Sequence, residues 1–182
     1  MKIEQPGGHL DQMIRQTRAS LMQLSSMADS KANMLLTAAS VVITLCVPHL
    51  GSSAFRIPLV ILVGGSLVTA LMAAWCNYPR LPSAKHVSLE EARSEDFNIL
   101  FFGDFSRMPY GQFEQAIGSA FNDQNRAYAI QLREIHALGC FLAKRKYRLV
   151  RWCYLSFMTS LICSACLALA QALGFLGQLN GT

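Results

Sequence analysis

The sequence predicts an all-α membrane protein with three transmembrane helices, an internal N-terminus, an external C-terminus and cytoplasmic helical extensions. Three observations predict this class: the composition, the position of uncharged windows and the distribution of basic residues. Of the 182 residues, 52% are apolar and 15% are charged, against about 25% charged in soluble domains. Residues 32–55, 57–79 and 152–182 contain no Asp, Glu, Lys or Arg. Each window can cross a hydrocarbon core of about 30 Å as a helix.

Basic residues set the expected orientation of these spans. Four precede residue 32, eleven lie between Pro79 and Trp152, and Arg56 alone separates the first two windows. Because basic loops stay in the cytoplasm, we expect residues 1–31 and 80–151 inside and the turn at Gly51–Arg56 outside. The net charge of +5 then suits contact with an anionic lipid bilayer, and it requires no nucleic acid polymer as a partner.

Residues 1–31 are expected to form a cytoplasmic amphipathic helix, because apolar residues recur there at helical spacing. This helix should continue directly into the first span, with the membrane stretch beginning near Met27. Residues 32–79 are expected to form a transmembrane hairpin of two spans. Pro58 suits the first turn of the second span.

Residues 80–151 are expected to be a cytoplasmic helical and loop region that acts as a sensor. Between Ser83 and Gly111 the helical pattern is interrupted by turn-forming residues and by carboxylates at 90, 91, 95 and 96. These carboxylates suit either a cation site or, more simply, the exposed first turn of a helix. From Tyr110 the helical period returns without a proline, which predicts one long helix. That helix should enter a third span at residues 152–177, followed by a tail at 178–182.

The sequence contains no catalytic constellation that we recognise: it lacks a zinc-protease motif, a phosphate-binding glycine loop and a nucleophile elbow. We therefore expect a protein that is not an enzyme and that holds neither a cofactor nor a metal. Cys163 and Cys166 form a CxxC inside an apolar span, where packing or lipid contact is the simpler interpretation. The spans have no ionisable carboxylate or basic group, which argues against an ion pump.

Small residues repeat every fourth position on two spans. On the third span they are Ser156, Ser160, Ser164, Ala168 and Ala172, and on the second Ser66, Ala70 and Ala74. Small side chains allow helix backbones to approach closely in lipid. Packing within one chain and self-association both explain the pattern, and the longer series favours a homo-oligomer.

A basic run stands just before the third span, and two interpretations of it remain open. It is either an orientation anchor on anionic lipid or part of a phosphate site. In the second case, Arg133 and His136 lie upstream on the expected helix, and aromatic rings are available to stack on a base. The candidate ligand-binding residues are Lys144, Arg145, Arg148, Arg133, His136, Phe101, Phe102 and Tyr147.

Three stretches in order carry a family resemblance: DSKANMLLTAAS at 29–40, NILFFGDFSRMPYGQF at 98–113 and IHALGCFLAKRKYRLVRWCYLSF at 135–157. Their order and spacing resemble the transmembrane effectors of the Pycsar antiphage systems. The resemblance implies a multi-pass protein of the bacterial inner membrane whose functional partner is a pyrimidine cyclase. It further implies activation by a cyclic pyrimidine nucleotide, cUMP or cCMP, followed by loss of inner-membrane integrity and abortive infection.

The resemblance maps onto motif positions and does not say which of them touch the ligand. These positions are Asp29, Lys31, Asn33, Asn98, Phe101, Phe102, Gly103, Lys144, Tyr147 and Arg148. Two other functions fit the composition. One is a non-catalytic membrane anchor or adaptor that recruits a partner through residues 83–111. The other is a holin-like membrane disruptor that needs no messenger. A membrane enzyme comes third, because no catalytic constellation was found.

Overall fold

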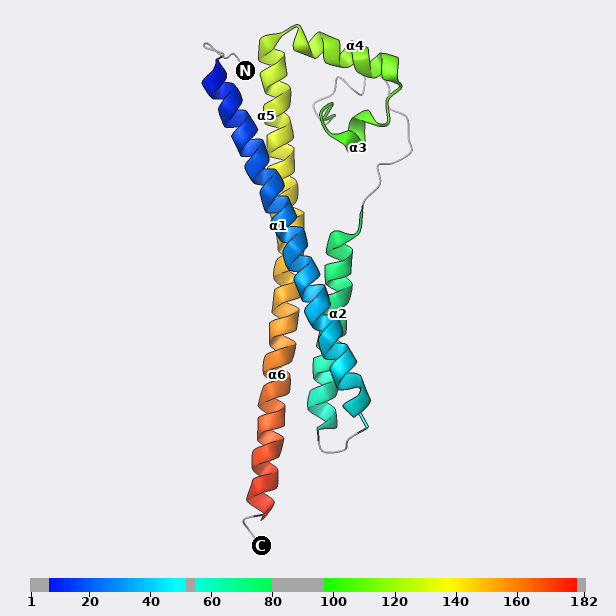
Figure 1. Ribbon diagram of the computed structural model, residues 1–182, viewed down its shortest axis with the longest axis vertical. Coiled ribbons are helices and arrows are strands. Elements are labelled where there is room, and N and C mark those ends of the chain that lie inside the picture. Colours follow the sequence, from blue (N-terminus) through cyan, green and yellow to red (C-terminus); the bar gives the residue numbers. More distant parts are fainter. Residues whose placement is uncertain (1–6, 52–54, 80–96, 180–182) are drawn as a thin grey trace. The chain divides into compact units, whose positions relative to one another are not determined.

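A computed structural model of the chain describes residues 7–51, 55–79 and 97–179 (Figure 1). All regular elements in these three ranges are helical. The acidic residues at 90, 91, 95 and 96 lie outside the described residues. Three of the helical stretches, Gly8–His49, Arg56–Asn77 and Gln124–Gly174, are long and apolar enough to cross a membrane. The predicted all-helical class with three candidate spans is therefore confirmed.

Helix α1 runs without interruption over Gly8–Cys46, so the amphipathic N-terminal segment does continue directly into the first apolar window. The chain contains no proline between Pro6 and Pro48 and no glycine between Gly8 and Gly51, so neither helix-breaking residue interrupts this segment. Pro48 lies within a short 3-10 helix, Val47–His49, that follows α1.

Helix α2 spans Arg56–Asn77, and Pro58 lies in its first turn as predicted. Its last residue is followed by Tyr78 in an extended conformation (φ −62°, ψ 119°). Tyr78 precedes Pro79, and a residue before proline is disfavoured in the helical region by contact with the proline ring. The proline therefore accounts for where α2 ends.

The prediction of one long helix from Tyr110 is wrong. The structure has α4 at Tyr110–Phe121 and α5 at Gln124–Phe141, preceded by the short α3 at Phe102–Phe105. Asp123 has an extended backbone, and its carboxylate accepts hydrogen bonds from the backbone N–H groups of Asn125 (3.0 Å) and Arg126 (3.3 Å). An N-cap of this kind starts a new helix even though the apolar period continues across it.

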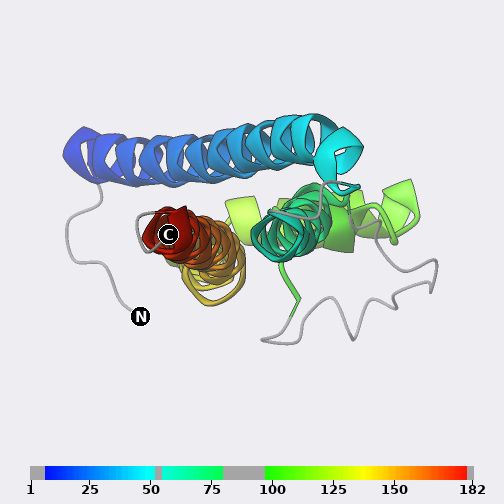
Figure 2. The same ribbon diagram turned by 90° about the horizontal axis from the view of Figure 1, so that it is seen from below.

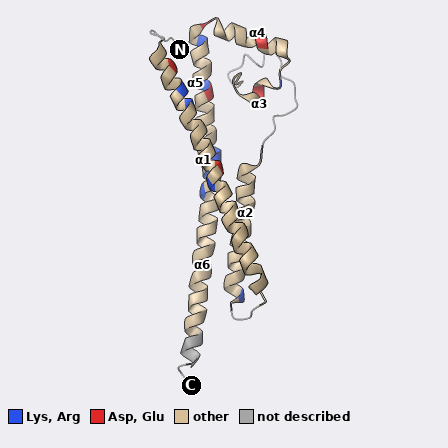
Figure 3. Ribbon diagram, in the orientation of Figure 1, with Lys and Arg blue, Asp and Glu red and all other residues tan. Residues whose placement is uncertain are grey.

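After α5, the helical path continues through a π-helical segment, Leu142–Lys146, into α6 at Tyr147–Leu179. A π-helical segment widens the helix by one residue and is often found at functional sites. This segment coincides with the start of the basic run. Figure 3 shows charged residues along the N-terminal half of α1 and along α5, and only Arg56 on α2.

The chain forms two compact units. Unit 1 comprises residues 1–24 and 79–143, and unit 2 comprises residues 25–78 and 144–182. Helix α1 contributes residues to both units, and so does the path from α5 to α6. The two units are therefore joined by two helical connections, α1 and the path from α5 to α6.

In unit 2, residues of α1 and α6 pack with α2 through small side chains. Ala28, Ala32 and Val150 form one buried cluster, and Leu35, Ala73 and Cys153 form another. Helices α2 and α6 lie side by side, as both Figure 1 and Figure 2 show. On α2 the buried positions are Pro58, Ser66, Thr69 and Ala73. Ala74 is exposed, so the predicted face of Ser66, Ala70 and Ala74 is displaced by about one residue toward Thr69 and Ala73.

Candidate functional site

Unit 1 contains a cavity of about 250 Å³. It lies between the N-terminal half of α1, the segment before α3, and helices α4 and α5, which together supply its lining. The lining residues are Ile14, Arg15, Arg18, Ile99, Leu100, Ile117, Ala120, Phe121, Ala127, Ile130, Gln131, Glu134 and Ile135. The volume is slightly below the range of about 300–1,000 Å³ that is usual for ligand pockets.

The floor of this cavity is continuous with the apolar core of unit 1. Phe97, Ile99 and Met108 are buried together, and part-buried side chains from α4 and α5 pack on them. This packing explains why the segment before α3 is held in place although it has little regular structure. Two hydrogen bonds at Asn98 add to this: its backbone N–H donates to the Asp104 carboxylate at 3.1 Å, and its side-chain oxygen accepts from the Leu100 backbone N–H at 3.2 Å.

The polar groups of the cavity come from two helices. Arg18 on α1 and Glu134 on α5 form an ion pair at 2.9 Å, in which the Glu134 side chain is 12% exposed and that of Arg18 is 52% exposed. Arg15 lies one turn before Arg18, and Gln131 lies one turn before Glu134. The cavity thus combines apolar walls with two guanidinium groups, one carboxylate and one amide.

A second contact joins α1 to α5 near the cavity. The Tyr128 hydroxyl donates a hydrogen bond to the Asp11 carboxylate at 2.6 Å, and Tyr128 is buried. A hydrogen bond to an ionised acceptor is stronger than one between neutral groups. Together with the Arg18–Glu134 pair, it fixes the register of α1 on α5 in unit 1.

The eight ligand-binding residues predicted from the sequence do not line the cavity. Arg133 and His136 are exposed on α5, and the His136 ring lies 3.6 Å from the Cys140 sulfur. Phe101 and Phe102 are about half exposed, with ring centroids 5.0 Å apart. Phe101 also covers Gly103, where an added Cβ would come within 2.4 Å of the ring.

The other four predicted residues belong to unit 2. Lys144, Arg145 and Arg148 are exposed, while Tyr147 is packed against the buried cluster of Ala28, Ala32 and Val150. The packing of Tyr147 is partial, and its stacking on a base stays a prediction. The charged residues that line the cavity, Arg15, Arg18 and Glu134, were not among the residues predicted from the sequence. The signal for the first two was present, since two arginines three residues apart share one helix face.

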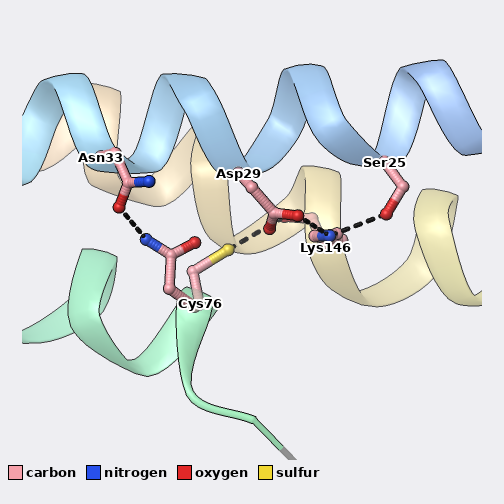
Figure 4. A network of polar contacts seen from close by, with 6 residues as sticks. Ser25, Asp29, Asn33, Cys76 and Lys146 are labelled. Atoms are coloured by element: carbon pink, nitrogen blue, oxygen red, sulfur yellow. Dashed lines mark hydrogen bonds and ion pairs between the residues drawn. The ribbon is translucent and has the colours of Figure 1, made fainter.

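Two motif residues of unit 2, Asp29 and Asn33, lie in a polar cluster between helices (Figure 4). The Lys146 ammonium forms an ion pair with Asp29 at 2.7 Å and donates to the Ser25 hydroxyl at 2.8 Å. Asn77 donates to the Asn33 side-chain oxygen at 2.6 Å. We call these five residues, Ser25, Asp29, Asn33, Asn77 and Lys146, the inter-helix polar cluster. It joins α1 to both α2 and the π-helical segment.

Comparison with known families identifies the chain. The family model described as the Pycsar effector protein domain matches residues 12–174. The chain belongs to the Pycsar effector family. No curated protein and no solved structure shows a significant match. The family match includes residues of both compact units, so the cavity and the inter-helix polar cluster both lie within the Pycsar effector domain.

In this Pycsar effector, two members of the small-residue series of α6, Ser160 and Ser164, contact α2 of the same chain. Ser160 and Ser164 are buried, and Ser164 donates a hydrogen bond to the Pro58 carbonyl oxygen at 2.9 Å. A Cβ added at Gly65 would lie 2.1 Å from the Ser160 Cβ, so the two helices approach as closely as a glycine allows. Part of the face that could serve self-association is therefore occupied within the chain.

The described part of this Pycsar effector lacks a cluster of metal-ligating side chains. Within the ranges given above, no group of three or more His, Cys, Asp or Glu side chains could hold a metal ion. Cys163 and Cys166 are both exposed on α6 and neither is part of a disulfide. The arrangement that the structure does offer is a small, partly charged cavity and a tightly packed set of apolar helices.

Proposed function

We propose that this Pycsar effector is an antiphage defence protein that a cyclic pyrimidine mononucleotide, cUMP or cCMP, activates to impair the bacterial inner membrane. The nucleotide is supplied by a pyrimidine cyclase, and the outcome is abortive infection. The observation that carries the proposal is the family match over residues 12–174. The match includes the second and third candidate spans completely and most of the first. In this proposal the chain catalyses no reaction.

The proposed membrane topology places residues 1–31 and 80–151 in the cytoplasm, residues 32–79 and 152–177 in the membrane and residues 178–182 outside. It is supported by the excess of basic residues in the two cytoplasmic segments. With this topology a cytoplasmic nucleotide meets unit 1. The helical paths α1 and α5 to α6 then provide the connection to unit 2.

Activation is a change in population between a resting and an active arrangement of the helices. A ligand that moves such an equilibrium from 1:99 to 99:1 must bind the active form more tightly by about 5.5 kcal/mol. We propose that activation separates α2 from α6, which frees the faces of Ser160 and Ser164 for assembly of a homo-oligomer. Small-residue faces favour such association in lipid.

The experiment is a measurement of membrane potential and dye entry in cells that express the protein with a pyrimidine cyclase. A catalytically inactive cyclase is the matched control. Depolarisation only with the active cyclase is the expected result. Depolarisation with either cyclase would instead indicate a messenger-independent, holin-like disruptor, and intact membranes with both would favour a non-catalytic anchor or adaptor.

A second experiment, with purified protein in liposomes, identifies which nucleotide activates the protein. Dye release is followed after addition of cCMP, cUMP or a cyclic purine nucleotide to vesicles that carry the full-length chain. We expect release with one of the two pyrimidine nucleotides and none with the purine nucleotide. Release with neither pyrimidine nucleotide would overturn direct activation.

A further inference from the structure

We propose that the cavity of unit 1 is the binding site of the activating nucleotide, with Arg15 and Arg18 pairing with its phosphate. This inference rests on the proposed function and names the site at which it is exerted. It replaces the basic run before the third span, which the sequence suggested, with residues on α1, α4 and α5.

The charge of the cavity favours a single anion. Its ionisable lining consists of Arg15, Arg18 and Glu134, which leaves one positive charge in excess. Arg18 already pairs with Glu134. Arg15 has no hydrogen-bond or ion-pair partner among the residues that the structure describes. Two guanidinium groups one turn apart can share the oxygens of one phosphate, as arginines commonly do.

The remaining lining favours a ligand that also carries an apolar ring. Ile14, Ile99, Leu100 and Ile117 form aliphatic walls, and Phe121 contributes an aromatic ring. Rings of this kind stack on nucleobases with little dependence on sequence. A bare phosphate ion would leave these walls in contact with water. A mononucleotide fills both the charged and the apolar part.

Glu134 imposes a further requirement on the ligand. Its side chain is 12% exposed and its ion-pair partner is Arg18. If a phosphate takes over Arg18, this carboxylate loses its partner in poorly hydrated surroundings, which is unfavourable. The ligand must therefore donate a hydrogen bond to Glu134, as a ribose hydroxyl or a base N–H group can. A cyclic mononucleotide has both a phosphate and such donors.

Binding at this place would also change a contact between helices. The Arg18–Glu134 pair joins α1 to α5 directly, and the nucleotide would insert between its two members. Both helices continue along the chain into unit 2. The site is thus on the two helical paths through which the proposed function requires a signal to pass.

The test is equilibrium binding of labelled cCMP and cUMP to the full-length protein in detergent micelles. The first variant is Arg15→Gln, which breaks no ion pair of the described residues and so leaves the fold intact. The second is Arg18→Gln. Each should weaken binding of the activating nucleotide about tenfold or more, the scale of one lost charge-assisted contact. Arg126→Gln, an exposed residue of α5 that does not line the cavity, is the matched control and should bind as the unaltered chain does.

The triple variant Lys144→Gln, Arg145→Gln, Arg148→Gln tests the competing site. Loss of binding in that variant, with normal binding by Arg15→Gln and Arg18→Gln, would overturn the cavity as the site and leave the proposed function standing. If the unaltered chain binds neither nucleotide, the proposed function fails, and this inference fails with it. Circular dichroism and size-exclusion profiles confirm that each variant is folded.

Discussion

At the scale of single residues, the Asp29–Lys146 pair makes an asymmetric prediction. The Lys146 side chain is 12% exposed and that of Asp29 is 44% exposed. Asp29→Asn removes the partner of a poorly hydrated ammonium group, which should lower the free energy of unfolding by about 1–3 kcal/mol. Lys146→Met leaves a carboxylate that water still reaches, so its cost should be smaller. Thermal unfolding in detergent measures both.

The double variant Asp29→Asn, Lys146→Met provides the control for this pair. Its stability should be close to that of Lys146→Met alone, because the ammonium that Asp29 served is then absent. Ser25→Ala removes only one neutral acceptor and should cost less than Asp29→Asn. Equal losses for Asp29→Asn and Lys146→Met, with additivity in the double variant, would contradict a coupled pair.

The same residues show how far the sequence could be interpreted at this scale. The motif positions Asp29, Asn33 and Tyr147 were singled out from the sequence, and all three contribute to contacts in unit 2. Their partners could not be predicted, since Asp29 and Lys146 are 117 positions apart. Lys146 looked like one more member of a basic run, and only packing separates it from its exposed neighbours.

At the scale of elements, the contact of α2 with α6 predicts the behaviour of two adjacent glycines. A Cβ at Gly65 would lie 2.1 Å from the Ser160 Cβ, and one at Gly64 would meet nothing within 4 Å. Gly65→Ala should therefore push the helices apart and cost about 1–3 kcal/mol. Under the proposed function it should also raise dye release in the absence of nucleotide, because it favours separation of α2 from α6.

Gly64→Ala is the matched control, with the same added methyl group in open space, and it should be neutral or slightly stabilising because alanine favours helix. Ser160→Gly in the Gly65→Ala background should restore part of the lost stability by making room for the methyl group. If both alanine variants unfold at the same temperature as the unaltered chain, the close approach of α2 and α6 is wrong.

Element boundaries show why the sequence was informative in the apolar segments and less so between them. The continuity of α1 and the start of α2 followed from long apolar windows and from the positions of proline. The break between α4 and α5 did not, because the apolar period continues across Asn122 and Asp123. A cap formed by one carboxylate and two backbone N–H groups overrides that period.

At the scale of the whole chain, the candidate site was less accessible to sequence reasoning than the fold. Three apolar windows predict three helices wherever those helices pack. The cavity instead depends on α1 meeting α4 and α5 across about a hundred positions, and on Arg18 being placed opposite Glu134. The predicted ligand-binding residues included a cluster of basic residues that are close together in sequence. The charged residues Arg18 and Glu134, which line one cavity, are far apart in sequence.

The proposed orientation of the whole chain gives the last prediction. In a variant without the six native cysteines, Gly51→Cys should react with a membrane-impermeant maleimide in intact cells, because the turn after the first span faces outward. Ser119→Cys, exposed on α4, should react only after the cells are opened. Both expectations follow from the proposed topology, which rests on the eleven basic residues between Pro79 and Trp152.

Labelling of both cysteines after the cells are opened is the control for their reactivity, and an unlabelled cytoplasmic protein in the intact cells is the control for leakage. The reverse pattern, with Ser119→Cys reactive in intact cells, would place unit 1 outside. It would separate the cavity from any nucleotide made in the cytoplasm. The orientation is therefore a condition for activation by a cytoplasmic cyclase, and it can be tested without knowing the ligand.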